Sequence, residues 1–247
     1  MARSARLLTK AEAAEFFKRL SAARPDPRTE LDYADPFTLL VAVVLSAQAT
    51  DKGVNKATPA LFAAAPTPQA MAALGEAKIG KLIQTIGLWR MKAKNVAALS
   101  QALIERHAGQ VPHDRAALEA LPGVGRKTAN VVLAEAFGEA TIAVDTHVFR
   151  VAHRAGLSRG KTPDAVEADL MRLTPKEYLR GAHHWLILHG RYVCLARRPD
   201  CPNCLVRDLC RFPDKTGEPY AEAKRAKAPV SARAKSSAPA GARARKR

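Results

Sequence analysis

The chain turns between two helical segments at the stretch Leu121-Pro122-Gly123-Val124-Gly125-Arg126-Lys127-Thr128-Ala129-Asn130. Two glycines two positions apart permit a turn so tight that backbone N–H groups point outward together. The positive end of the following helix dipole favours an anion at the same place. The turn is therefore suited to binding a phosphate of a nucleic acid backbone, although ordinary turns between helices also contain glycine.

The segments around this turn have the apolar spacing of helices. From about Gly125 to Phe137 the apolar residues share one face, Lys127 lies off that face, and Gly138 is placed to end the helix. A further helix should begin at Asp145, which occupies a capping position, with four apolar residues facing inward: Val148, Val151, Ala152 and Ala155. No run alternates convincingly between apolar and polar residues, so the predicted fold class is all-α.

A helix is expected to begin at Asp35-Pro36, and its apolar face leads to a polar residue. Its expected apolar face consists of Phe37, Leu40, Val41, Val44 and Leu45, and the next position on that face is Gln48. An amide at such a position must either find buried partners or face a cleft. We expect Gln48 to face a cleft.

The charge of the chain is strongly positive. The 247 residues carry a formal net charge of +17, of which residues 221–247 contribute +8 and the remaining chain +9. Such a field attracts polyanions. No apolar stretch is long enough to span a membrane and the first residues lack a signal sequence, so we expect a cytoplasmic protein that does not bind a membrane.

All four cysteines are close together in the sequence, at Cys194, Cys201, Cys204 and Cys210, with six, two and five residues between them. In a compartment that keeps thiols reduced, metal ligation is a better explanation than disulfides. Structural zinc sites usually have two close pairs of ligands, and only one close pair is present here. The spacing therefore favours an iron–sulfur cluster and leaves zinc as the alternative.

The motifs together resemble the endonuclease III family of helix-hairpin-helix DNA glycosylases. The resemblance rests on the turn quoted above and on three further stretches, Leu45-Ser46-Ala47-Gln48-Ala49-Thr50-Asp51, Thr141-Ile142-Ala143-Val144-Asp145-Thr146-His147 and His184-Trp185-Leu186-Ile187-Leu188-His189-Gly190-Arg191-Tyr192. It extends from about residue 30 to about residue 212. The resemblance implies a bifunctional DNA glycosylase and abasic-site lyase that removes oxidised pyrimidines from double-stranded DNA, acts as a monomer and carries a [4Fe-4S] cluster on the four cysteines.

Two catalytic residues follow from the resemblance. Lys127 would attack C1′ of a flipped nucleotide as a neutral amine, and the resulting Schiff base would lead to strand cleavage by β-elimination. Asp145 would stabilise the developing positive charge or accept a proton. From the residues alone, Lys127 can also be a surface lysine on a phosphate, and Asp145 can be no more than a helix cap.

The expected DNA contacts fall into three groups. Gln48 would enter the gap that the flipped nucleotide leaves, and the loop at Ile86 and Leu88 would supply an apolar wedge, with Leu88 the better candidate. The turn would bind phosphate through Gly123, Val124, Gly125 and Arg126. In the loop between Cys194 and Cys201, Arg197 and Arg198 would grip phosphates. Ordinary packing of the wedge loop and a solvated arginine loop are the alternatives.

The resemblance also implies a division into domains. Residues 29–139 would form a six-helix barrel domain, with the helix-hairpin-helix at about 114–137. Residues 1–28 and 140–217 would form an iron–sulfur cluster domain, and the DNA would lie in a groove between the two. Residues 218–247 would be a disordered basic tail that strengthens nonspecific DNA binding.

Two other functions have to be distinguished from this one. An adenine-mismatch DNA glycosylase shares the hairpin, the aspartate and the cluster, but it differs at the lysine position and has an extra domain, for which the residues after Cys210 are too few. A non-catalytic DNA-binding protein with a redox-sensing cluster would bind DNA and leave it intact.

Overall fold

The structure is a computed structural model that describes residues 6–217. This part of the chain contains ten α-helices, one short 3-10 helix and no strand, which confirms the all-α prediction. The α-helices are α1 (Lys10–Ala23), α2 (Pro36–Leu45), α3 (Asp51–Ala64), α4 (Pro68–Ile83), α5 (Trp89–His107), α6 (Arg115–Glu119), α7 (Arg126–Phe137), α8 (Thr146–Ala155), α9 (Pro163–Leu173) and α10 (Lys176–Tyr192). The 3-10 helix is η1 (Cys201–Asn203). The predicted basic tail, residues 218–247, lies outside the described residues.

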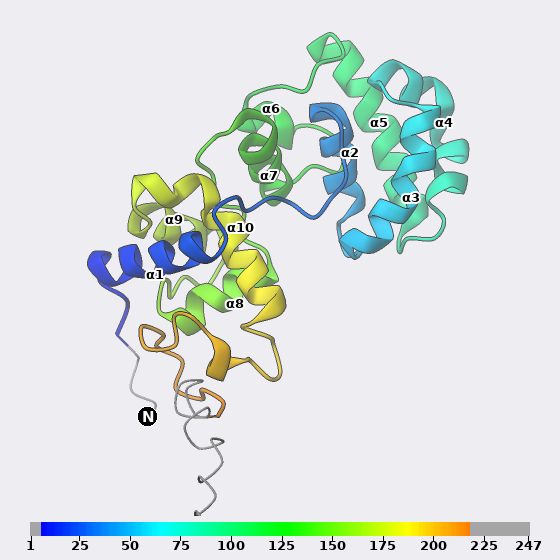
Figure 1. Cartoon of the computed structure of the whole chain (residues 1–247). Helices are drawn as coiled ribbons and strands as arrows, with labels where there is room; N and C mark the ends of the chain where they lie inside the picture. The colour runs from blue at the N-terminus through cyan, green and yellow to red at the C-terminus, as the bar shows by residue number, and fades with distance from the viewer. Residues whose placement is uncertain (1–5, 218–247) are drawn as a thin grey trace, which may run out of the picture.

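The helices are grouped around two hydrophobic cores. Helices α2 to α7 surround the first core, whereas α1, α8, α9 and α10 surround the second, as Figure 1 shows in its upper right and lower left parts. The chain leaves the second group after α1 and returns to it before α8. The segment that returns lies between the cores, because Ala143 belongs to the first core while Ile142 and Val144 belong to the second.

Local sequence signals set where the helices begin and end. Asp35 caps α2 by accepting a hydrogen bond from the backbone N–H of Thr38, and Pro36 occupies the first turn. Gly138 ends α7 with φ 71°, a conformation that glycine adopts without strain. Helix α4 is broken at Gly75, whose φ of 74° and ψ of 161° are not helical.

Helix α2 differs from its prediction. The sequence predicted one apolar face, but every residue from Phe37 to Leu45 is buried. The physical reason is that α2 packs against α3, α5 and α7 and so has no solvent-facing side. The helix ends at Leu45, so Gln48 lies in the following turn, with φ 53°, rather than on a continued helical face.

No helix between residues 6 and 217 is both long and apolar enough to cross a lipid bilayer.

Candidate active site and cysteine pocket

An open pocket of about 1420 Å³ lies where the two groups of helices meet. Lys127 from the start of α7, Asp145 from the start of α8 and Gln48 from the turn after α2 all line it. Arg191 of α10 and Lys161, just before α9, line it as well. The fold thus brings together three predicted site residues that are far apart in the sequence.

Lys127 lies between this pocket and a smaller one, since it lines both. Its side chain is exposed, as its place off the apolar face of α7 predicted. His183 and His184 line the smaller pocket. Burial, followed by the charges of His184 and Lys127, lowers the pKa of His183 well below 6.5. His183 is therefore neutral, and its Nδ1 donates to the carbonyl oxygen of Ala143 at 2.8 Å.

Asp145 uses one carboxylate oxygen as a helix cap. Its Oδ1 accepts hydrogen bonds from the backbone N–H groups of His147 and Val148, each at 2.8 Å. Its Oδ2 has no hydrogen-bond partner in the part of the chain that the structure describes, and the residue lines the pocket. Capping and catalysis are therefore compatible, because one oxygen caps the helix and leaves the other without a hydrogen bond in a residue that lines the pocket.

The glycine turn before α7 has the predicted tight geometry. Gly123 has φ 77°, and a Cβ at this position would lie 2.9 Å from the Cβ of Asn95. Gly125 is the N-cap of α7 and has no side chain that could accept a hydrogen bond, so no side-chain cap occupies the N–H groups at the start of this helix among residues 6–217. This is the arrangement that binds a phosphate oxygen at a helix start.

Two residues of this turn have protein partners. Val124 is 7% exposed, and its N–H donates to Leu121 O at 3.1 Å, so its contact with DNA stays a prediction. Arg126 does not extend freely towards a phosphate, because its guanidinium forms a two-pronged contact with Glu167 at 2.9 and 3.0 Å. The hydrogen bond and charge of Glu167 raise the pKa of Arg126.

The predicted wedge loop lies beside Gln48. A Cβ on Gly87 would lie 3.9 Å from the backbone oxygen of Gln48, so the two loops are neighbours. Leu88 is 49% exposed, with a left-handed φ of 59°. Ile86 is only 5% exposed and belongs to the first core, so its contact with DNA stays a prediction and Leu88 is the better candidate for the wedge. It packs beneath the loop and supports it, whereas Leu88 is the apolar side chain at the surface.

All four cysteines line a single pocket, and none forms a disulfide. Burial raises the pKa of Cys204 to about 12 and also raises the pKa of Cys210. Thiolates here consequently need strong positive charge nearby. Within residues 6–217, no three His, Cys, Asp or Glu side chains are arranged to hold a single metal ion. A cluster differs in this respect, because each cysteine then binds a different iron and the sulfurs lie further apart.

The loop that follows Cys194 is fixed by an arginine of α8. Arg154 donates to the carbonyl oxygens of Leu195 and Ala196 at 2.7 and 2.8 Å. Arg197 and Arg198 are exposed on this loop. The loop therefore presents two arginines on a backbone that is already ordered, which lowers the entropic cost of binding an anion.

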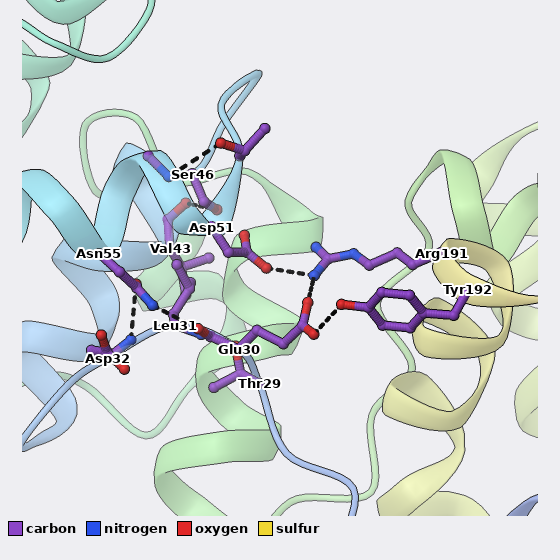
Figure 2. Close-up of polar contacts among 12 residues, drawn as sticks. Thr29, Glu30, Leu31, Asp32, Val43, Ser46, Asp51, Asn55, Arg191 and Tyr192 are labelled. Atoms are coloured by element: carbon purple, nitrogen blue, oxygen red, sulfur yellow. Dashed lines mark hydrogen bonds and ion pairs between the residues drawn. The ribbon is translucent and has the colours of Figure 1, made fainter.

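A charged cluster beside the pocket was not predicted from the sequence. Figure 2 shows Arg191 donating to Asp51 at 2.6 Å and to Glu30, while the hydroxyl of Tyr192 also donates to Glu30. Burial raises the pKa of Glu30, but the hydrogen bonds from Tyr192 and Arg191 outweigh it, and the pKa is lowered below 4.5. Asp51 and Arg191 belong to two of the stretches on which the family resemblance rested. Their place in those stretches is the sequence signal that could have identified them as site residues.

Comparisons with known proteins agree with this geometry. Residues 41–176 match the model of the HhH-GPD superfamily of base excision DNA repair proteins. An endonuclease III of Treponema pallidum is 60% identical over 205 residues, which cover 83% of this chain and 97% of the relative. The endonuclease III of Escherichia coli K12 is 53% identical over 84% of this chain and 99% of its own. A solved structure of a trapped endonuclease III–DNA covalent intermediate, an estranged-adenine complex, matches with a TM-score of 0.79 and 46% identity. This match covers 83% of this chain and 97% of the other.

Proposed function

The chain belongs to the endonuclease III family of the HhH-GPD superfamily of base excision DNA repair proteins, and from this premise we propose how its residues act. It is a DNA glycosylase and abasic-site lyase, and its partner is damaged DNA. One observation carries the assignment of the catalytic residues: Lys127, Asp145 and Gln48 line one open pocket between the two cores.

Lys127 is the nucleophile in this proposal. The lone pair of its neutral Nζ attacks C1′ of the flipped nucleotide, the bond to the damaged base breaks, and the base leaves with the bonding electrons and takes up a proton. The nitrogen then loses one proton, and its lone pair opens the sugar ring by breaking the bond between C1′ and O4′. O4′ takes up a proton, and a protonated Schiff base forms. Loss of a C2′ proton expels the 3′ phosphate, which is the β-elimination step. The substrates are oxidised pyrimidines.

Asp145 assists these steps through Oδ2. Its negative charge stabilises the positive charge that develops on the sugar, and the same oxygen can accept a proton during elimination. Because Oδ1 is held by two backbone N–H groups, the carboxylate is already oriented before DNA binds. Such preorganisation avoids a cost of reorientation during the reaction.

The DNA is held by groups around the pocket. Backbone N–H groups at Gly123 and Gly125 bind a phosphate, as do the exposed side chains of Arg197 and Arg198. Gln48 and Leu88 stand on neighbouring loops and fill the gap left by the flipped nucleotide. The body of the protein is basic, which supports binding along the backbone.

The cysteine pocket would hold a [4Fe-4S] cluster. Cys194, Cys201, Cys204 and Cys210 supply four thiolates to one cavity, and their burial makes a cationic cluster the partner that stabilises them. These four residues would hold the cluster within the segment that follows α10, where the loop between Cys194 and Cys201 carries Arg197 and Arg198. Zinc is the alternative, and the spacing of the cysteines, with one close pair instead of two, disfavours it.

The two cores correspond in this proposal to two domains. The first, residues 29–139, is the six-helix barrel, and the second, residues 1–28 with 140–217, is the cluster domain. We propose a monomer that works in the cytoplasm of a bacterium, at the nucleoid, because that is where its substrate is.

Covalent trapping tests the nucleophile. Wild-type protein is incubated with duplex containing thymine glycol, or with abasic duplex, and borohydride is added to reduce the Schiff base to a stable adduct. Lys127→Ala should form no adduct. Lys161→Ala is the matched control, since it removes the same charge from the same pocket and should still form the adduct. Trapping by Lys127→Ala would show that another amine reacts, and wild-type protein that binds the duplex without cutting it would favour the non-catalytic alternative.

A further inference from the structure

Glu167 of α9 is a carboxylate almost fully enclosed by protein. Its side chain is 9% exposed, and both of its oxygens bind the guanidinium of Arg126, at 2.9 and 3.0 Å. A two-pronged arginine–carboxylate contact fixes the relative orientation of its partners as well as their distance. The neighbour of Arg126 in the sequence is Lys127.

A second arginine reaches the same carboxylate. Arg115 lies 3.5 Å from Glu167 Oε1, and it is the first residue of α6, just as Arg126 is the first residue of α7. Helices α6 and α7 are the two helices of the hairpin, and they pack against each other. Glu167 therefore holds the starts of both hairpin helices at one point.

Glu167 belongs to α9, one of the helices around the second core, whereas the hairpin helices surround the first core. Val166 and Leu170, on either side of Glu167 in α9, are fully buried in the second core. The second core also carries α8, which begins next to Asp145 and packs against α9. Pro163, at the start of α9, lines the candidate active pocket. The carboxylate of Glu167 thus connects α7, which contains Lys127, to the second core, which includes the helix α8 that Asp145 caps.

We propose that Glu167 is a positioning residue for the reaction, which sets the placement of Lys127 relative to Asp145 by tying Arg126 and Arg115 to the second core. This inference rests on the proposed function. Glu167 does not line the pocket, and its contacts are with Arg126 and Arg115 at the starts of the two hairpin helices, so its effect passes through the hairpin. A displacement of reacting groups by about 1 Å lowers a rate by about a hundredfold.

The test compares Glu167→Gln with wild-type protein in single-turnover reactions on thymine glycol duplex. Glu167→Gln keeps the shape of the side chain but loses the charge that holds both arginines. We expect a rate constant lower by about ten- to a hundredfold. We expect the Kd for undamaged duplex to be unchanged or lower, because the substitution removes a negative charge and releases Arg126.

Asp164→Asn is the matched control. Asp164 lies one turn before Glu167 on the same helix, and its carboxylate is 3.6 Å from Arg126, but its side chain is 73% exposed. The substitution changes the net charge equally and should leave the rate constant within about twofold of wild type, since exposed ion pairs contribute little. Arg126→Gln combined with Glu167→Gln should be no slower than Glu167→Gln alone, because both changes break the same contact.

The endpoint yield of borohydride adduct separates positioning from loss of folded protein. A folding defect lowers the yield and leaves the rate constant of the remaining active molecules unchanged, which would overturn the proposal. So would a wild-type rate in Glu167→Gln while wild-type protein reacts normally. If wild-type protein itself neither releases the base nor cuts the strand, the proposed function fails first, and the positioning role fails with it.

Discussion

Substitution of Asp145 separates its two roles, because one carboxylate oxygen caps α8 and the other has no hydrogen-bond partner among residues 6–217. Asparagine retains a side-chain oxygen that can cap the helix, but it carries no charge. Alanine removes both the cap and the charge. Stability and catalysis should therefore respond differently to Asp145→Asn and Asp145→Ala.

The expected loss of stability follows from the capping contacts. A lost N-cap costs about 1 kcal/mol, and loss of a negative charge at a helix start costs about 0.3–1 kcal/mol. Asp145→Ala should therefore destabilise by about 1–2 kcal/mol and Asp145→Asn by less than about 1 kcal/mol. In a protein of this size, about 1 kcal/mol corresponds to a fall in Tm of about 2–4 °C.

The expected loss of activity is similar in the two variants. A positioned acid or base contributes about a hundred- to ten-thousandfold, so base release by either variant should slow by about that factor. Thermal unfolding followed by circular dichroism gives Tm, and single-turnover kinetics on thymine glycol duplex gives the rate. Full activity in Asp145→Asn would refute a catalytic role for the carboxylate. Equal Tm values for wild-type protein and Asp145→Ala would refute the capping argument.

Four further predictions concern other parts of the molecule. Leu88→Ala should slow release of the damaged base without lowering Tm, whereas Ile86→Ala should cost about 2–5 kcal/mol in the free energy of unfolding, measured with urea, because Ile86 is buried. Cys201→Ser should lose bound iron and sulfide, measured by chemical analysis and visible absorption; wild-type protein that contains zinc without iron would contradict the cluster. The pKa of Glu30 is lowered below 4.5, because its hydrogen bonds outweigh the effect of burial, so its contribution to stability is present above that pH and is lost as the pH falls through the lowered pKa. Urea unfolding of Glu30→Gln should accordingly depend less on pH in the acid range than that of wild-type protein. Removal of residues 218–247 should flatten the salt dependence of nonspecific DNA binding, and an unchanged slope would show that this segment makes no phosphate contacts.

Several local features could be predicted from the sequence because short segments determine them. Asp145 was expected to cap a helix, and it accepts two backbone hydrogen bonds at the start of α8. Gly138 was expected to end α7, and it does so with a positive φ. Capping and chain reversal depend on residues within a few positions of each other, so the order of residue types along the chain is enough to predict them.

The sequence could not predict the surroundings of a side chain where distant parts of the chain supply them. The apolar residues Ile86 and Leu88 are two positions apart and look alike in the sequence, but one is in the first core and the other is at the surface. Arg126 was expected to bind phosphate because its sequence neighbours suit that role. Its partner Glu167 lies 41 positions away and could not be identified from local spacing.

The sequence by itself determined the helical class, the positions of the caps, the four cysteines and the family to which the chain belongs. Only the tertiary structure decided that Lys127 and Asp145 share a pocket. It also decided that one carboxylate oxygen of Asp145 takes no part in capping α8, and that Glu167 connects the hairpin to the second core. The physical reason is the distance along the chain over which each kind of interaction acts. Backbone hydrogen bonding and helical periodicity act over a few residues, whereas burial, ion pairing and pocket formation depend on which segments pack together across the whole chain.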